Sequence, residues 1–236
     1  AEFLRRLGVS AIKVSSSDAN NLPYLRRIAK WNLPILLSTG MSTLAEIREA
    51  VHAIQNPSSD KNRSAPFKKG RIKDRTPLIL LQCTTNYPTP FREANLRAIP
   101  IMREAFGVPV GFSDHTEGFE AACAAVALGA SVIEKHFTLD RTLPGPDHTL
   151  SLEPQELSDF IRHIRHVEQA LGTGDKTPFP SEKRLARVAR KSVVALCVIK
   201  KGERFTEENL GLKRPGTGLA PKYYDYILGK KSTRNI

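Results

Sequence analysis

The chain has 236 residues, a length that fits one large domain or a large domain followed by a small one. Hydrophobic residues make up 40% and charged residues 25%, which argues against a disordered chain, a collagen and a disulfide scaffold. No apolar run approaches the roughly 18–20 residues that a membrane helix needs, and residues 1–6 lack the apolar core of a signal peptide. The chain does not begin with Met, so we expect a processed, trimmed or partial polypeptide, located in the cytoplasm.

The net charge of +12 is concentrated in two stretches. Residues 57–76 carry seven Lys/Arg against two Asp, and residues 175–236 carry fifteen Lys/Arg against six acidic residues. A basic protein can bind nucleic acid, anionic lipid or an anionic metabolite. Because no zinc-finger or ribonucleoprotein motif is present, we predict a solvated basic surface without a nucleic-acid or membrane partner.

Three cysteines, Cys83, Cys123 and Cys197, lie far apart in the sequence and have no metal-ligand spacing. An odd number of cysteines suits a reducing compartment. We therefore interpret all three as small buried hydrophobic side chains.

From the N-terminus to about residue 172 one pattern repeats: a short apolar run, a polar turn and a segment with helical periodicity. The apolar runs do not alternate with polar residues, as expected of strands that are buried on both faces. They cover residues 12–16, 34–39, 78–83, 110–115 and 132–137. The helical segments cover residues 22–31, 44–54, 95–106, 119–128 and 155–171. Ser42 is a candidate N-cap, Pro154 suits a first helical position, and Gly172 suits a helix end.

Strands that alternate with helices indicate βαβ units and a parallel sheet, and therefore an α/β protein. Periodicity alone does not separate a doubly wound sheet from a closed (β/α)₈ barrel. A barrel needs eight units and about 250 residues. The five visible units therefore imply, for a barrel, three further units before residue 1.

The sequence divides into three parts. Residues 1–172 form the α/β domain, interrupted by a basic surface loop over residues 57–76 that lacks apolar periodicity. Residues 173–190 form a polar linker. Residues 191–236 form a second domain, which is small enough to be marginal on its own and is expected to dock on something.

All five predicted strands end in hydroxyl, amide, imidazole or charged side chains. Ligands of parallel α/β proteins bind at these carboxyl ends, so the pattern predicts a polar pocket. Lys13 supplies a point charge, and Ser16, Ser38 and Ser113 supply hydroxyl donors, a set that suits a small phosphorylated anion. No P-loop or dinucleotide fingerprint is present, so we do not expect a nucleotide cofactor.

Two histidines at neighbouring strand ends predict a metal site. Because residues i and i+2 share a face of a strand, Ser113 points with His115, and Glu134 points with His136. Two imidazoles can bind a divalent ion and leave its other coordination positions open for substrate oxygens. His52, His163 and His166 fall on predicted helices, and we interpret them as surface residues.

Seven ordered motifs between residues 13 and 216 resemble those of the sialic acid synthase family, that is, N-acetylneuraminate synthase and its bacterial relatives. Any one motif alone would be weak evidence, and the ordered set is specific. The motifs are KVSSSDANN (13–21), LSTGM (37–41), CTTNYPTP (83–90), GFSDHT (111–116), EKHFT (134–138), GPDH (145–148) and KRPG (213–216).

The resemblance implies a (β/α)₈ TIM barrel followed by an antifreeze-like (SAF) domain. It places the five visible strands as barrel strands four to eight, so strands one to three and the extreme C-terminus would be absent. In the family the absent strands carry a catalytic Glu and further substrate ligands. The resemblance therefore leaves open whether the chain as given is active.

The implied reaction condenses phosphoenolpyruvate with an N-acetylated hexosamine and releases phosphate. N-acetylmannosamine is the first candidate for this sugar. The resemblance implies a divalent metal ion held by His115 and His136, manganese first, with magnesium or cobalt as alternatives. It also implies a domain-swapped homodimer in which the small domain delivers Arg214 to the partner's sugar. The remaining positions carried over are Lys13, Ser16, Ser38, Thr85 and Ser113 for phosphoenolpyruvate, Tyr87 and Asp147 for the sugar, and Asp18 as an acid–base or water-positioning residue.

Two departures from the family pattern affect this interpretation. The family has Gly-Ser-Gly-Glu after the first strand's Lys, whereas this chain has Ser15-Ser16-Ser17-Asp18, and the basic loop 57–76 resembles an insertion. Thr85 also stands where some relatives have Asn. Three alternatives stay open: a legionaminic or pseudaminic acid synthase of the same mechanism, a non-catalytic carbohydrate-binding protein, and a nucleic-acid binder that uses the basic residues of 57–76 and 175–236.

Overall fold

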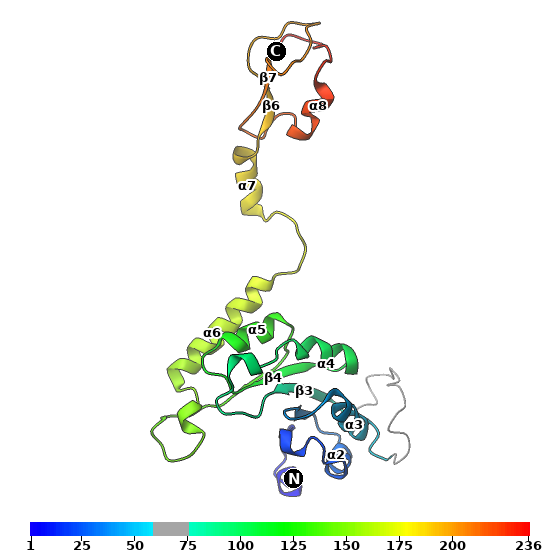
Figure 1. Ribbon diagram of the computed structural model, residues 1–236, viewed down its shortest axis with the longest axis vertical. Coiled ribbons are helices and arrows are strands. Elements are labelled where there is room, and N and C mark those ends of the chain that lie inside the picture. Colours follow the sequence, from blue (N-terminus) through cyan, green and yellow to red (C-terminus); the bar gives the residue numbers. More distant parts are fainter. Residues whose placement is uncertain (59–75) are drawn as a thin grey trace. The chain divides into compact units, whose positions relative to one another are not determined.

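The computed structural model describes residues 1–58 and 76–236 and divides into two units, Ala1–Thr173 and Gly174–Ile236 (Figure 1). We call them unit 1 and unit 2 and describe each by itself. The predicted basic loop over residues 57–76 falls, apart from its first two residues and its last, outside the described residues. The predicted linker over residues 173–190 contains helix α7 (Pro180–Ala189), which belongs to unit 2.

Unit 1 contains a curled sheet of parallel strands, and each strand pairs with its neighbour in the sequence. A doubly wound sheet reverses its strand order at a switch point, and this order runs without reversal. The strand order therefore favours the barrel, and the prediction of a partial (β/α)₈ fold is confirmed. The strands are β1 (Ile12–Val14), β2 (Ile35–Ser38), β3 (Leu78–Cys83), β4 (Val110–Asp114) and β5 (Ile133–Lys135).

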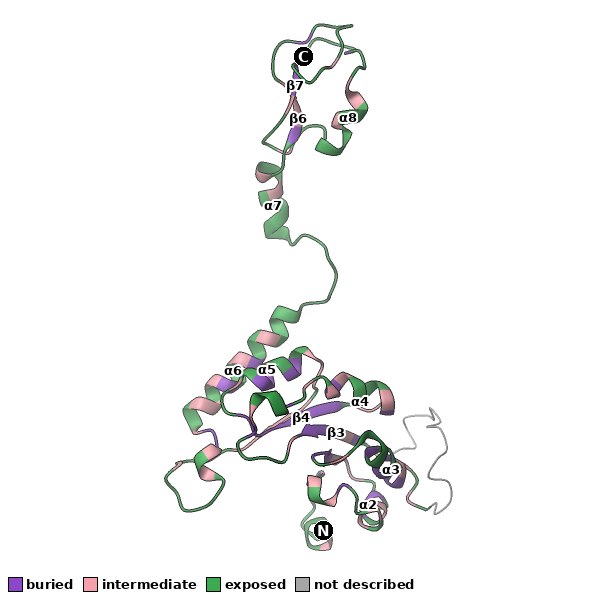
Figure 2. Cartoon of the chain, viewed as in Figure 1, coloured by how far each residue is buried: buried purple, intermediate pink, exposed green. Residues whose placement is uncertain are grey.

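Helices cover the outer face of this sheet (Figure 1). Their apolar sides are buried against the strands and against one another, and Leu25, Ile28, Ile54 and Met102 are almost wholly inaccessible to solvent. All five residues of β4 are buried, as the unalternating apolar pattern predicted (Figure 2). The helices of unit 1 are α1 (Glu2–Arg6), α2 (Leu22–Ala29), α3 (Leu44–Gln55), α4 (Ala98–Phe106), α5 (Glu120–Ala127) and α6 (Pro154–Leu171), with short 3₁₀ turns η1 (Ser16–Asp18), η3 (Phe91–Glu93) and η4 (His148–Leu150).

Helix ends follow local side-chain chemistry. Helix α3 starts in a capping box: Thr43 Oγ1 accepts the Glu46 N–H at 3.3 Å, and a Glu46 carboxylate oxygen accepts the Thr43 N–H at 2.7 Å. The prediction of Ser42 as N-cap was wrong by one residue. Pro154 opens α6 and Gly172 follows its last residue, as predicted. Helix α1 has no buried residue and was not predicted from the sequence.

Unit 2 is built on two antiparallel strands, β6 (Ser192–Ala195) and β7 (Leu210–Lys213). They are accompanied by α7, the 3₁₀ turn η5 (Pro221–Tyr223) and the one-turn helix α8 (Tyr224–Ile227). Helix α7 has no buried residue, and Figure 2 shows it mostly exposed. In the described parts of the chain, no helix is long and apolar enough to span a bilayer.

Candidate functional site

The carboxyl ends of the strands surround a cavity of about 210 Å³ in unit 1. Eight of the eleven predicted site residues line it: Lys13, Ser16, Ser38, Thr85, Tyr87, Ser113, His115 and His136. Ser15, Ser17, Met41, Cys83 and Glu134 complete the lining. A larger cavity of about 450 Å³ lies against β5, α5 and α6, but its lining is mainly apolar. The polar chemistry of the strand ends is therefore concentrated in the smaller cavity.

Strand register brings the side chains of β4 and β5 together. Ser113 pairs with Glu134, and the next pair along the two strands is Asp114 with Lys135. Because successive residues face opposite sides of a sheet, Ser113 and Glu134 face the cavity and Asp114 and Lys135 face away from it. His115 follows on the same side as Ser113. Alternation thus explains why every second residue of these motifs lines the cavity.

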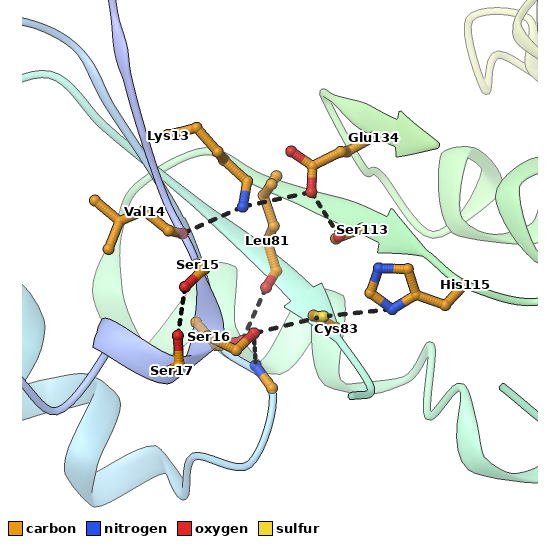
Figure 3. Close-up of polar contacts among 12 residues, drawn as sticks. Lys13, Val14, Ser15, Ser16, Ser17, Leu81, Cys83, Ser113, His115 and Glu134 are labelled. Atoms are coloured by element: carbon orange, nitrogen blue, oxygen red, sulfur yellow. Dashed lines mark hydrogen bonds and ion pairs between the residues drawn. The ribbon is translucent and has the colours of Figure 1, made fainter. Parts of the chain in front are cut away.

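A cation and a carboxylate meet on one side of the cavity (Figure 3). Lys13 Nζ lies 3.4 Å from a carboxylate oxygen of Glu134, and the Ser113 hydroxyl donates to the same oxygen at 2.7 Å. Both side chains of the ion pair are more than one-third exposed, so solvent screens the attraction. Lys13 is consequently available to a ligand anion that competes with Glu134.

The segment at the end of β2 contains a hydroxyl without a hydrogen-bond partner, Ser38, and a glycine, Gly40, at a place with no room for a side chain. Ser38 Oγ is buried and has no hydrogen-bond partner among the described residues. A Cβ on Gly40 would lie 2.4 Å from Thr85 Oγ1 and 2.8 Å from Ser16 Oγ. The Gly40 N–H instead donates to Ser16 Oγ at 3.0 Å. A buried donor without a partner is costly, so Ser38 marks a place for a polar ligand group.

Three rings lie close together in the cavity lining. The centroids of His115 and His136 are 5.3 Å apart, and the Tyr87 ring lies 4.1 Å from His115 and 5.7 Å from His136. His115 Nδ1 lies 2.9 Å from the Thr84 carbonyl oxygen, which only accepts hydrogen bonds. Nδ1 is therefore the protonated nitrogen of the neutral ring. Nε2 keeps its lone pair for a metal ion or a proton.

The electrostatics of these side chains differ. Burial disfavours charged His115, but its hydrogen bonds with Cys83 and with the Thr84 carbonyl outweigh burial and raise its pKa. Burial, followed by repulsion from His115, lowers the pKa of His136 and leaves that ring neutral at pH 7. Burial, followed by the negative charge of the Cys83 sulfur when it is ionised, raises the pKa of Tyr87, so its hydroxyl stays a donor.

The donor set fits a divalent ion only in part. Two imidazoles face one cavity, one of them with its tautomer set by a backbone carbonyl, as in many metal sites. Within residues 1–58 and 76–236, no group of three or more His, Cys, Asp or Glu side chains is placed to hold a metal. His115 and His136 would thus supply two nitrogen ligands, and water or substrate oxygens would fill the other positions.

The model of the NeuB family matches residues 1–176, which is most of the chain. The chain belongs to the NeuB family. The model of the SAF domain matches residues 190–236, so the predicted antifreeze-like domain is confirmed as well.

The relatives of this NeuB-family chain include proteins named as synthases of legionaminic and pseudaminic acids. The N,N'-diacetyllegionaminic acid synthase of Campylobacter jejuni is 46% identical over 99% of this chain and 66% of that protein. The pseudaminic acid synthase of the same bacterium is 40% identical over 100% of this chain and 64% of that protein. The crystal structure of an N-acetylneuraminic acid synthetase from Leptospira borgpetersenii, in complex with citrate, is 35% identical with a TM-score of 0.66, covering 78% of this chain and 59% of that one. The chain spans just under two thirds of the length of the curated relatives named here.

Three predicted site residues do not line the cavity. Asp147 lies near it, with Oδ2 3.8 Å from His136 Nδ1. Asp18 ends η1, and its carboxylate accepts a hydrogen bond from Asn21 Nδ2 at 3.2 Å. Arg214 belongs to unit 2, where it directly follows β7. The roles predicted for these three residues stay predictions.

Among the lining residues that were given no role from the sequence, Glu134 and Cys83 carry reactive groups, a carboxylate and a thiol. Glu134 shares a strand face with His136, and that spacing was the available signal. Cys83 is buried, but its sulfur accepts from Ser16 Oγ at 3.6 Å and lies 3.9 Å from His115 Nδ1. The interpretation of the cysteines as buried hydrophobes was therefore incomplete for Cys83, and it was wrong for Cys197, which is exposed.

Proposed function

We propose that the whole protein condenses phosphoenolpyruvate with an N-acetylated amino sugar to give a nonulosonic acid, and that it releases phosphate. The observation that carries this proposal is the juxtaposition in one cavity of Lys13, the unpartnered hydroxyl of Ser38 and two imidazoles. A cation with hydroxyl donors binds an anion, and the imidazoles serve a reacting carbonyl group beside it. The NeuB-family relatives named as sialic, legionaminic and pseudaminic acid synthases support the same reaction class.

In this reaction, carbon 3 of phosphoenolpyruvate forms a bond to the aldehyde carbon of the open-chain sugar. Water adds at carbon 2, and the phosphate group leaves as inorganic phosphate. A divalent ion held by His115 and His136, with manganese as the preferred candidate, would polarise the aldehyde oxygen as a Lewis acid. Tyr87, packed against both rings, keeps a protonated hydroxyl that can hydrogen-bond the sugar.

On the anion side, Lys13 neutralises charge, and Ser16, Ser38, Thr85 and Ser113 supply hydroxyl groups. Glu134 is the carboxylate that lines the cavity, whereas Asp18 is not part of the lining. We therefore assign the proton-handling carboxylate of this part of the site to Glu134. Its hydrogen bond from Ser113 holds it beside Lys13, within reach of the bound anion.

The sugar has two candidates. The resemblance to the sialic acid synthase family implies N-acetylmannosamine and hence N-acetylneuraminate as the product. A second candidate is the synthesis of N,N'-diacetyllegionaminic acid, because synthases of that name from Campylobacter jejuni and Legionella pneumophila are 46% and 39% identical to this chain. A cytoplasmic location and a domain-swapped homodimer, in which Arg214 of the partner subunit binds the sugar, belong to the same proposal.

The test is phosphate release by the whole protein with phosphoenolpyruvate and Mn²⁺. We expect release only when an amino sugar is present, and the two candidates are separated by comparing N-acetylmannosamine with a hexose that carries two acetamido groups. Lys13→Ala should raise KM for phosphoenolpyruvate about 10-fold or more, with a much smaller effect on KM for the sugar, because one charge-assisted contact is lost. Lys30→Ala, an exposed lysine at the end of α2, is the control. Sugar-independent release, or equal effects on both KM values, would contradict the proposal.

A further inference from the structure

The strands that carry the two histidines are joined by a buried ion pair on the side opposite the cavity. Asp114 and Lys135 are register partners in β4 and β5. Asp114 Oδ2 lies 2.9 Å from Lys135 Nζ, and the two side chains are 0% and 5% exposed. The pair comes one residue after the Ser113–Glu134 pair of the cavity, and directly before His115 and His136.

The same ion pair also holds the loop after β4. Asp114 Oδ1 accepts from the N–H and the hydroxyl of Thr116 at 2.8 and 2.7 Å, and Lys135 Nζ donates to the Thr116 carbonyl. The two residues that flank His115 are thus both bonded to Lys135, which itself precedes His136. The Phe160 ring of α6 lies 5.8 Å from Lys135 Nζ and restrains the lysine from the helix side.

Stability alone does not explain a charged pair at this place. Removing two charges from water costs more than their attraction often returns, and a well-packed apolar pair would join the strands at least as firmly. A hydrogen-bonded ion pair differs from an apolar pair because it fixes the directions and distances of the groups that it joins. Here the fixed groups are the backbone segments on both sides of His115 and the residue beside His136.

We propose that Asp114 and Lys135 are positioning residues that hold His115 and His136 at the separation needed to bind one divalent ion together. This inference rests on the metal site of the proposed function. Side chains on the outer side of the sheet thereby contribute to metal binding on the inner side. They act through the hydrogen bonds of Lys135 in β5 to Asp114 and to the Thr116 carbonyl, on either side of His115.

The test titrates Mn²⁺ alone into the full chain and follows free Mn²⁺ by electron paramagnetic resonance. Asp114→Asn keeps the size and an acceptor oxygen but removes the charge, and we expect Mn²⁺ to bind about 10–100-fold more weakly, the usual effect of losing a partner behind a metal ligand. Because a single change leaves Lys135 buried without its counter-charge, the second variant is D114N/K135M, which removes both charges. Leu25→Ala, on the buried face of α2 and outside the cavity lining, is the control for lost stability.

Selective weakening in both ion-pair variants, with Leu25→Ala binding like wild type, supports the proposal. Wild-type affinity in folded D114N or D114N/K135M, or an equal loss in Leu25→Ala, overturns it. If the wild-type chain binds no Mn²⁺, the metal part of the proposed function fails instead, and amide hydrogen exchange then decides about the ion pair. Faster exchange in D114N confined to residues 113–116 and 133–138 supports a positioning role, and unchanged or uniformly faster exchange overturns it.

Discussion

Units 1 and 2 reach their folds by different means. In unit 1, strands such as β4 are buried throughout and packed under helices, with side chains such as Phe112 and Leu80 removed from solvent. In unit 2, all of which the structure describes, Ile199 and Leu210 are the only buried apolar side chains. Apolar burial therefore supplies most of the stability of unit 1, whereas unit 2 has little of it to use.

Polar side chains take over part of this task in unit 2. Buried Ser192 donates to the Pro215 carbonyl at 2.8 Å, and buried Asn209 accepts from the Thr206 N–H and donates to the Arg204 carbonyl at 2.8 and 2.9 Å. Each such bond contributes only about 0.5–1.5 kcal/mol net, less than the roughly 1.5–3 kcal/mol from burying one large apolar side chain. We therefore expect unit 2 to have a smaller free energy of unfolding than unit 1, the unit that contains the cavity of the proposed chemistry.

The largest expected effect tests whether both units serve one site. His115→Ala removes one of two imidazoles, and Arg214→Ala removes the guanidinium proposed to bind the sugar in the partner's barrel. Each variant of the whole protein should lose at least about 100-fold in activity, since even groups behind a metal ligand cost 10–100-fold. Mixing the two variants and allowing subunit exchange should restore about a quarter of wild-type activity, because one site of each heterodimer is then intact.

The matched control mixes His115→Ala with His136→Ala. Both residues belong to unit 1, so no heterodimer of these variants contains an intact site, and activity should not return. Failure of the first mixture to recover, with heterodimers demonstrated by mass spectrometry, would leave Arg214 acting in its own subunit or not at all.

A second comparison places the same kind of change in each unit. Leu80→Ala and Ile199→Ala both remove a fully buried aliphatic side chain and should each cost about 2–5 kcal/mol. We expect unit 1 to stay folded with a lowered midpoint in urea, and unit 2 to unfold, because it has fewer apolar contacts to lose. Trp31, the chain's single tryptophan, reports on unit 1, and amide exchange measured by mass spectrometry reports on unit 2.

The outcome for Ile199→Ala also shows how independent the units are. Suppose that Ile199→Ala lowers the urea midpoint that Trp31 reports for unit 1 together with the stability of unit 2. The two units then unfold together, and the contrast between them does not hold.

The smallest effect is expected at the start of α3. Thr43→Ala removes the cap and should cost about 1 kcal/mol, whereas Ser42→Ala should change little. Hydrogen bonds from the Thr43 N–H and hydroxyl lower the pKa of Glu46 below its usual value of 4.5. The carboxylate's contribution is therefore present above that value and lost as pH falls through the lowered pKa. The difference in urea midpoint between Thr43→Ala and wild type, followed by Trp31, should therefore become smaller as the pH falls below 4.5. A difference that does not change with pH would contradict this coupling.

Local patterns in the sequence were sufficient for much of the fold and part of the site. Unalternating apolar runs indicated strands buried on both faces, and β3 and β4 are such strands. Pro154 and Gly172 indicated the ends of α6, because their backbone preferences act within one or two residues. The polar residues at strand ends indicated a pocket, because parallel strands bring their carboxyl ends to one edge of the sheet.

Only the tertiary structure decided what depends on partners distant in the sequence. Strand order separated the barrel from a doubly wound sheet, and periodicity contains no information about order. Register placed Glu134 beside Ser113, gave the buried Asp114 its partner Lys135, and brought the Cys83 sulfur near His115. The curl of the sheet brought Lys13 of β1, at the opposite edge, to Glu134. The physical reason is one of range: alternation and helical periodicity are set by neighbouring residues, so the sequence alone shows which side chains share a face. Which side chain then meets which depends on the packing of strands far apart in the chain.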